Sequence, residues 1–282
     1  MIATARTPRV AAARKLTRSV SRATAGRFLA EGPQAVSAAL VPVRPNVVGR
    51  VHELFGTPAG LARHADLVAA AASADVAVTP ITDAAMRVLC ETVTPAGIVA
   101  VCATVDVGLD DVLREPPNLV AVLAQVRDPG NAGTVLRTAD AAGAGAVVFA
   151  ADSVDPYNGK CVRASAGSLF HVALVRDISA AAAMDRLCRA GLRILAADGT
   201  GEVTLDELVD AGALAEPTAW VFGNEARGLP AEVGVAADAR VRIPIHGRAE
   251  SLNIGAAAAI CLYASARAQH SGRPEAGRGR ER

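Results

Sequence analysis

Residues 119–139 read LVAVLAQVRDPGNAGTVLRTA: an apolar run, then a polar, glycine-bearing stretch, then residues with helical periodicity. The run predicts a strand buried on both faces, with a helix over 131–142 after it. The alternation continues, with strands expected at 146–150, 171–175, 192–197, 218–222 and 239–243, and helices at 158–169, 180–190, 230–236 and 251–268. It predicts an α/β domain with a mostly parallel sheet over residues 119–268.

Two later segments repeat this pattern of a polar, glycine-rich stretch directly after an apolar run. Residues 221–229 read VFGNEARGL, and residues 243–253 read IPIHGRAESLN. Open α/β sheets bind ligands at the carboxyl ends of their strands. We therefore expect these two segments and residues 128–139 to form one site.

The N-terminal part predicts a second, smaller α/β unit. Strands are expected at 47–55, 76–78 and 97–105, and helices at 33–40 and 83–91. We assign residues 21–106 to this domain and the proline-bearing residues 107–118 to a linker. Residues 1–20 lack sustained periodicity and are predicted to be a disordered basic arm. Residues 269–282, polar and rich in Gly and Arg, are predicted to be a disordered tail.

Charge is distributed unevenly along the 282 residues, although the net charge is only +1. Residues 1–65 hold ten Arg and Lys against two acids, whereas the remainder holds 19 basic and 26 acidic residues. Such an asymmetry suggests a basic part that meets a polyanion, and the alternative is a solvated charged surface. On charge, we expect Arg18, Arg22 and Arg27 to contact this polyanion, which could be a nucleic acid such as RNA.

The five cysteines include no pair with C-x-x-C spacing, and the histidines do not cluster with them. This argues against a disulfide framework and a zinc site, and it fits a reducing cytoplasm. No apolar stretch approaches the ~18 residues of a membrane span. We therefore expect a cytoplasmic protein with neither a metal nor a membrane partner.

The three polar segments, in their order, spacing and residues, resemble the SpoU (TrmH) family of RNA ribose 2′-O-methyltransferases in the SPOUT superfamily. The similarity is to the rRNA-modifying branch that includes thiostrepton-resistance enzymes. It implies a trefoil knot in the C-terminal sheet, a homodimer formed through the knotted domain, and S-adenosylmethionine as cofactor. It also implies an N-terminal RNA-binding domain built like certain ribosomal proteins, with residues 28–40 resembling its start. The implied substrate is structured ribosomal RNA, foremost 23S rRNA, with tRNA as the alternative.

The resemblance implies five catalytic residues, and four of them also have a simpler interpretation. They are Arg137, Asn131, Glu225, Ser251 and Asn253. Arg137 would act as a general base or as a clamp on the target phosphate, and alone it is an ordinary helix-surface arginine. Asn131 and Ser251 are also good helix caps. Glu225 could pair with Arg227 or Arg248 as a surface ion bridge.

Cofactor contacts in the family are largely made by backbone. By position they are implied at Ala197, Gly199, Gly223, Ile243 and Leu252. Two histidines near the motifs receive no chemical role: His246 is expected to face solvent, and His171 to be structural.

Two rival functions follow from the same residues. Residues 130–133 follow a strand and open a helix, and Asp152 lies ~20 residues on, as in a dinucleotide-binding dehydrogenase. That reading lacks the G-x-G-x-x-G spacing and leaves the other two segments unexplained. The second rival is a non-catalytic RNA-binding paralogue, but such a protein should have lost some of the five catalytic residues.

Overall fold

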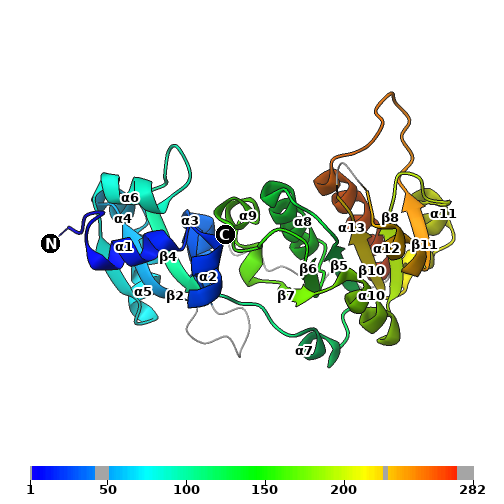
Figure 1. The fold of residues 1–282 in the computed structure, drawn as a ribbon, viewed down its shortest axis with the longest axis horizontal. Helices are drawn as coiled ribbons and strands as arrows, with labels where there is room; N and C mark the ends of the chain where they lie inside the picture. Colours follow the sequence, from blue (N-terminus) through cyan, green and yellow to red (C-terminus); the bar gives the residue numbers. More distant parts are fainter. Residues whose placement is uncertain (1, 42–50, 225–227, 272–282) are drawn as a thin grey trace.

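In the computed structural model, which describes residues 2–41, 51–224 and 228–271, the chain forms two sheets along one long axis (Figure 1). The first sheet has four strands in the order β1-β4-β2-β3, and the second has seven in the order β7-β6-β5-β10-β8-β11-β9. Every strand pair of the second sheet is parallel. The predicted α/β class with a mostly parallel C-terminal sheet is confirmed.

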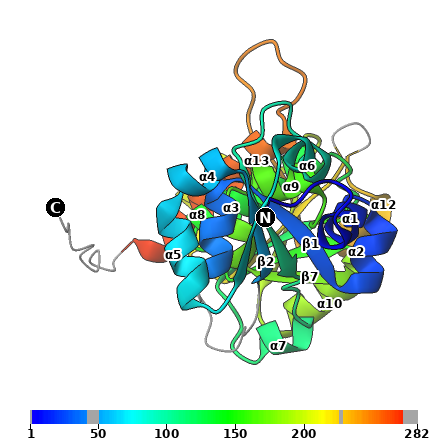
Figure 2. The same cartoon turned by 90° about the vertical axis from the view of Figure 1, so that its left-hand side faces the viewer.

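The N-terminal sheet is built from β1 (Arg27–Glu31), β2 (Val51–Gly56), β3 (Ala77–Pro80) and β4 (Ile98–Ala103). Around it lie α1 (Pro8–Lys15), α2 (Ser19–Ala25), α3 (Pro33–Leu40), α4 (Pro58–Arg63), α5 (Ala65–Ser73) and α6 (Asp83–Leu89) (Figure 2). The sequence analysis missed β1, because its RFLAE is too short to show a period. Phe28, Leu29 and Ala30 of this strand are nevertheless buried.

The prediction of a disordered arm over residues 1–20 is wrong for residues 2–20, which form α1 and the start of α2. Val10, Ala13 and Leu16 recur at three-residue spacing and are buried with Met86 and Leu89 of α6. The many charges of this segment obscure its narrow apolar stripe, since only Val10, Leu16 and the small Ala13 carry it.

The C-terminal sheet is built from β5 (Leu119–Leu123), β6 (Ala146–Ala150), β7 (Ala173–Ile178), β8 (Arg193–Ala197), β9 (Val203–Thr204), β10 (Thr218–Phe222) and β11 (Ala239–Arg242). Its helices are α8 (Pro129–Ala141), α9 (Gly159–Ala164), α10 (Ala180–Arg189), α11 (Leu205–Asp210), α12 (Ala231–Ala236) and α13 (Ile254–His270). Two 3-10 turns, Ser168–Phe170 and Ala213–Ala215, complete it. The prediction of a disordered tail is wrong for residues 269 and 270, which belong to α13, and residues 272–282 lie outside the described residues.

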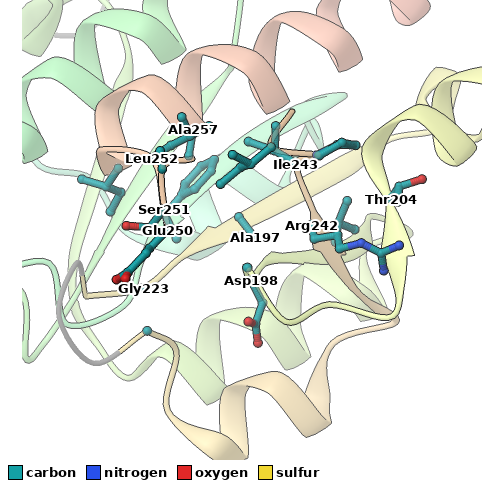
Figure 3. A pocket seen from close by; sticks show the side chains of 18 of the residues that line it. Ala197, Asp198, Thr204, Gly223, Arg242, Ile243, Glu250, Ser251, Leu252 and Ala257 are labelled. Carbon is teal, nitrogen blue, oxygen red and sulfur yellow. The ribbon is translucent and has the colours of Figure 1, made fainter. Parts of the chain in front are cut away.

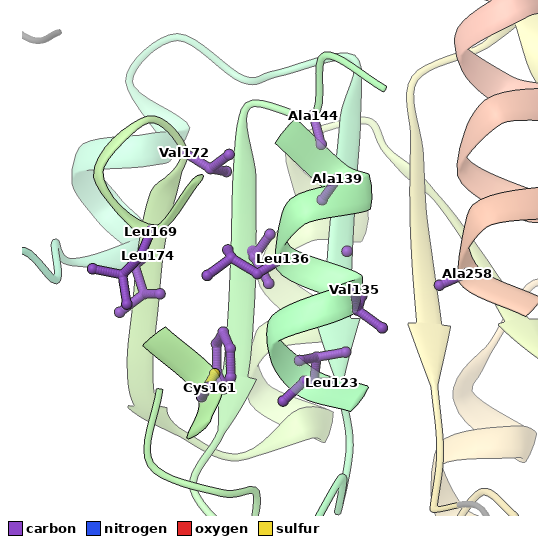
Figure 4. Close-up of a cluster of buried hydrophobic side chains, with 14 of the residues drawn as sticks. Leu123, Val135, Leu136, Ala139, Ala144, Cys161, Leu169, Val172, Leu174 and Ala258 are labelled. Carbon is purple, nitrogen blue, oxygen red and sulfur yellow. The ribbon is translucent and has the colours of Figure 1, made fainter. Parts of the chain in front are cut away.

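Side chains alternate across the C-terminal sheet and form two apolar layers. Leu119, Ala121 and Leu123 of β5 pack with α8, α9 and α13, whereas Val120 and Val122 pack on the opposite side with α10 and α12. Figure 4 shows the first layer, where Val135, Leu136 and Ala139 of α8 face the strands. Burial on both faces explains why these strands read as continuous apolar runs.

The two sheets share one apolar cluster. Phe28 of β1 packs against Tyr157 and Phe170, with ring centroids 4.6 and 5.9 Å apart. The expected linker, residues 107–118, contains a short helix, α7 (Leu109–Leu113), with Leu109 buried under the C-terminal sheet.

Arg22, expected to bind RNA, instead joins the two parts of the chain. Its side chain is 5% exposed, and Nε and Nη2 donate to Asp155 Oδ2 at 2.9 and 2.6 Å. Its Nη1 donates to the carbonyl oxygens of Leu16 and Thr17. A guanidinium committed to these partners is not free to bind phosphate, so the RNA-binding assignment of Arg22 is wrong.

Gly133 allows α8 and α9 to approach each other closely. A Cβ at this position would lie 2.4 Å from the Cys161 carbonyl oxygen and 2.6 Å from the Ala164 Cβ. We expect Gly133→Ala to lower the free energy of unfolding by about 1–3 kcal/mol, as overpacking does. Gly234→Ala in α12 is the matched control, because its Cβ would meet only Arg240 Cδ at 3.4 Å. Urea denaturation compares them, and equal stability of the two variants would contradict the close-packing account.

Candidate functional site

The three polar segments meet because their strands are neighbours in one parallel sheet. Phe222 at the end of β10 pairs with Leu123 of β5 on one side and with Ala197 of β8 on the other. The loops after these strands therefore leave the sheet at the same level. The segment after β11, residues 243–253, joins them from the next strand along.

A pocket of about 590 Å³ lies among the loops after β8, β10 and β11 (Figure 3). It is lined by all five residues expected to bind the cofactor, and by Ser251: the five are Ala197, Gly199, Gly223, Ile243 and Leu252. A volume of this size suits a small organic ligand. The structure thus places these six residues around one cavity.

Close packing requires a glycine at one of the two cofactor-site positions, Gly223, but not at the other, Gly199. A Cβ at Gly223 would lie 2.6 Å from the Gly228 carbonyl oxygen, so this glycine lets the two ends of the 223–228 loop come together. Asn224 and Gly228 exchange two backbone hydrogen bonds of 2.9 and 2.8 Å there. In contrast, a Cβ at Gly199 would meet no atom within 4 Å.

Asn224 ties this loop to the neighbouring one. Its Nδ2 donates to the Gln125 carbonyl oxygen, 3.1 Å away, directly after β5. Glu225 and Arg227, the other polar members of the segment, lie outside the described residues.

Asp128, not Asn131, caps helix α8. Its Oδ1 accepts from the Asn131 backbone N at 2.8 Å, and its Oδ2 accepts from Lys160 Nζ at 2.6 Å. The hydrogen bond from Lys160, followed by that from the Asn131 backbone, lowers the pKa of the Asp128 carboxyl below its usual value. Sequence analysis overlooked this cap, although an Asp directly before a Pro at the first helical position is a common helix start.

Because Asp128 provides the cap, the Asn131 side chain is available for another contact. Asn131 Oδ1 accepts from Asn253 Nδ2 at 3.1 Å, which joins two of the expected catalytic residues from segments 122 positions apart. Asn253 is the cap of α13, since its Oδ1 accepts from the Gly255 backbone N at 2.9 Å. The expected helix start at Ser251 is therefore wrong, and Ser251 remains an exposed residue of the pocket wall.

Arg137 lies in the middle of α8, and its side chain is exposed. No hydrogen bond or ion pair links it to any other residue in the parts of the chain that the structure describes. Gly255 of α13 lies close to the same helix, because a Cβ there would be 2.9 Å from Thr134 Cγ2. The exposed side of α8 thus presents a guanidinium with no internal partner.

Charged residues that the sequence analysis overlooked also line the pocket. Asp198 and Arg242 are engaged within the fold: Asp198 Oδ1 accepts from Thr200, and Arg242 Nη1 donates to the Gly201 carbonyl oxygen at 2.8 Å. Glu250 also lines the pocket and is exposed. These positions could have been suspected only from their places directly after β8 and before Ser251.

The two histidines lie as expected. His246 is exposed in the loop after β11, and His171 Nδ1 lies 2.9 Å from Asp140 Oδ2 on α8. Over residues 2–41, 51–224 and 228–271, no group of three or more His, Cys, Asp and Glu side chains could hold a metal ion. In the same ranges, no helix has the length and apolar character needed to span a membrane.

Comparison with known proteins places this site in a family. Residues 118–263 match the SpoU rRNA Methylase family. The 23S rRNA (guanosine(2553)-2′-O)-methyltransferase RlmP of Bacillus subtilis is 35% identical over 64% of this chain and 68% of its own length. The 23S rRNA (uridine(2479)-2′-O)-methyltransferase of Streptomyces viridochromogenes is 33% identical over 89% of this chain and 86% of its own length.

A solved structure resembles the whole fold. The AdoMet-bound rRNA methyltransferase from Sinorhizobium meliloti superposes with a TM-score of 0.76 at 28% identity, covering 94% of this chain and 97% of that one. The similarity therefore includes the N-terminal sheet as well as the matched C-terminal residues.

The double role of Asn253 can be tested by its effect on stability. Asn253→Ala removes both the cap of α13 and the bond to Asn131, and we expect it to lower the free energy of unfolding by about 1 kcal/mol. Asn253→Asp keeps an acceptor for the Gly255 backbone N and places a negative charge at the helix N-terminus. We expect it to unfold at nearly the wild-type urea concentration. An Asp variant as unstable as the Ala variant would show that the amide contact to Asn131, not the cap, stabilises the fold.

Proposed function

Because the chain belongs to the SpoU rRNA methylase family, we propose that it is an RNA methyltransferase. It transfers a methyl group from S-adenosylmethionine to a ribose 2′-hydroxyl of 23S ribosomal RNA. The observation that carries this proposal is the pocket at the strand ends, which is lined by two of the motifs. The third motif is joined to them by the hydrogen bond between Asn131 and Asn253. Both curated relatives described above are named 23S rRNA 2′-O-methyltransferases.

The pocket fits the proposed cofactor in size and chemistry. Ala197, Gly199, Gly223, Ile243 and Leu252 would hold it, offering backbone groups and small or apolar side chains. The cofactor supplies a methyl group that is already electrophilic, because it is bonded to a sulfonium. The protein's task is then to position the ribose hydroxyl and to assist the loss of its proton, for which no metal is needed.

Arg137 fits the role of a phosphate clamp better than that of a base. Its side chain is exposed to water, and a solvated guanidinium keeps its proton. With no internal partner among the described residues, Arg137 is available to grip the target phosphate with two parallel hydrogen bonds. The ribose hydroxyl would be oriented by this grip, with its proton passing to phosphate or water. Asn131 and Asn253, joined to each other, and Ser251 would provide further polar groups for the site. Glu225, which the resemblance assigns to the same site, lies outside the described residues.

The finer features of the family are part of the same proposal. We expect the sheet order, with β10 inserted between β5 and β8, to belong to a trefoil-knotted chain. We expect the N-terminal sheet to bind RNA as certain ribosomal proteins do, with Arg18 and Arg27 exposed for that purpose. Reaction on ribosomal RNA would take place in the cytoplasm. Two alternatives to methylation of 23S rRNA are distinguished by the experiments below: methylation of tRNA, and binding of RNA without catalysis.

The test of the function is methyl transfer by Arg137 variants. Arg137→Ala should bind S-adenosylmethionine as the wild type does but lose methyl transfer, because Arg137 is assigned to the RNA side of the site. Arg137→Lys should recover little, since it keeps the charge without the planar fork, and a ~1 Å misplacement can cost ~100-fold in rate. Calorimetry measures cofactor binding. Incorporation of labelled methyl into unmodified 23S rRNA and tRNA, followed by mapping of 2′-O-methyl groups, measures activity.

Leu252→Arg is the complementary variant. Leu252 lines the pocket and is 39% exposed, so an arginine there would occupy the cavity and should abolish cofactor binding. Val235→Arg, at an 87% exposed position of α12, is its control and should bind normally. Near-wild-type methyl transfer by Arg137→Ala would remove Arg137 from the mechanism. A wild type that binds the cofactor but methylates neither RNA would favour the non-catalytic alternative.

Homodimer formation is proposed through the last helix. Ile260 and Tyr263 of α13 are 40% and 69% exposed and, at a spacing of three, share one face of the helix. Exposed apolar side chains on one helical face suit an interface between copies. The double variant Ile260→Glu/Tyr263→Glu should sediment as a monomer at micromolar concentration, whereas Val235→Glu should not change the wild-type state. A monomeric wild type with full activity would contradict the proposal.

A further inference from the structure

We infer that a groove between α4 and α6 of the N-terminal domain binds the phosphate backbone of the RNA substrate, outside the methyl-transfer pocket. This inference rests on the proposed function, because it names a second contact for the same RNA. The groove has a volume of about 310 Å³ and is lined by α4, α6 and the segment from Thr94 to Gly97.

Two arginines give the groove its charge. Arg63 is at the C-terminal end of α4 and Arg87 is on α6, and both line the groove and are exposed. Neither makes an ion pair or hydrogen bond within the described ranges. Asp83, in the first turn of α6, contributes one negative charge against these two positive charges. The groove is therefore net positive.

Three other arginines make ion pairs within the protein. Arg9 lies 3.4 Å from Glu53, Arg22 is buried against Asp155, and Arg163 lies 2.9 Å from Glu31. Unpaired guanidiniums on both sides of one groove suit a ligand with several negative charges, and arginine forks match phosphate oxygens.

The floor of the groove is rigid. A Cβ at Gly60 would lie only 2.1 Å from the Gly97 carbonyl oxygen, so α4 packs directly on the backbone that leads into β4. Thr57 Oγ1 accepts from the Gly60 backbone N at 3.0 Å and caps α4, while Thr82 caps α6 in the same way. Both helices are thus held by backbone contacts, which keeps their arginines at a set separation.

The loop that borders the groove and the loop that borders the methyl-transfer pocket lie on the same side of the molecule. In Figure 1 the loop between α6 and β4 projects from the same side as the loop between β11 and α13, and Figure 2 shows both projecting upward after a quarter turn. The first loop borders the groove, and the second forms part of the pocket wall. One RNA can therefore lie across both without wrapping around the protein.

The loop beside the groove also carries an apolar side chain in full contact with solvent. Val93 is 96% exposed, next to Thr94 at the groove edge. Such exposure leaves the side chain free to pack on a sugar or an unstacked base. A positive groove with an adjacent apolar contact fits an RNA loop or bend better than free phosphate, which would use the arginines alone.

The test compares two double variants that remove the same charge from opposite places. Arg63→Ala/Arg87→Ala removes the groove arginines. Arg114→Ala/Arg189→Ala removes two arginines with side chains 79% and 78% exposed, which pair with Asp111 and Asp185 at α7 and on α10. Both figures show α7 on the side opposite the two projecting loops. Affinity for an unmodified 23S rRNA transcript is measured over a range of salt concentrations.

The groove variant should bind RNA roughly tenfold more weakly near ~0.1 M salt, and its plot of log affinity against log salt should be less steep by about 1 to 2. The control should keep the wild-type slope. Val93→Ser should weaken binding without changing the slope. In methyl transfer, the groove variant should show a raised KM for RNA and a nearly unchanged kcat, with unaltered affinity for S-adenosylmethionine.

Each result bears on the inference separately from the proposed function. A groove variant with the wild-type salt slope, or a control with an equal loss, would overturn the inference while leaving methyl transfer by the wild type intact. Recovery of the slope by Arg63→Lys/Arg87→Lys would support a phosphate contact, since lysine keeps the charge. Inorganic phosphate would compete with RNA for the groove. If it inhibited RNA binding equally in the wild type and in the groove variant, the inference would also be contradicted, because phosphate would then be competing at another site.

Discussion

The site depends on the backbone pairing of β10 between β5 and β8. Phe222 is in register with both Leu123 and Ala197, so three strands end at one level of the sheet. Their loops then lie side by side, although they are separated by up to about a hundred residues of chain. Neither the pocket nor the contact between Asn131 and Asn253 could form if β10 paired elsewhere.

Two kinds of groups build the site around this pairing: tightly packed loops form the pocket wall, and polar side chains from two helices are assigned to the RNA. The pocket wall comes mostly from small or apolar residues on tightly packed loops, as at Gly223, where no Cβ fits beside Gly228. The polar groups assigned to the RNA come instead from α8 and from the start of α13, two helices that pack against each other. Asp128 and Asn253 cap these helices. The caps place the Asn131 and Asn253 amides opposite each other, because each cap determines where its helix begins.

Polar and aromatic contacts hold the N-terminal domain against the C-terminal domain that carries the site. Phe28 packs against Tyr157 with the rings tilted by 39°. The Tyr157 hydroxyl donates to Asp106 Oδ1 at 2.6 Å while accepting from the Val105 backbone N. Burial, and then the bond to Asp106, raises the pKa of the Tyr157 hydroxyl. Arg22 adds to these contacts through Asp155. A substrate held by the N-terminal sheet is thereby placed at a defined position relative to the pocket.

The sequence by itself determined the fold class and the C-terminal strands other than β9 to within a few residues, and its family resemblance indicated five of the residues that line the pocket. It could do so because strands buried on both faces must be continuously apolar, and because polar, glycine-rich loops interrupt them at recognisable places. Only the tertiary structure decided which polar and charged side chains are engaged within the fold and which remain available to bind a ligand. Arg22 and Arg63 look alike in sequence, yet Arg22 is buried against a carboxylate 133 residues away, whereas Arg63 lies beside a groove and pairs with none of the residues that the structure describes. In the same way, Asp128 rather than Asn131 caps α8, and three buried apolar residues help to order a segment whose lack of periodicity had predicted disorder. Partners so distant along the chain leave no local pattern, because the contact exists only after the chain has folded.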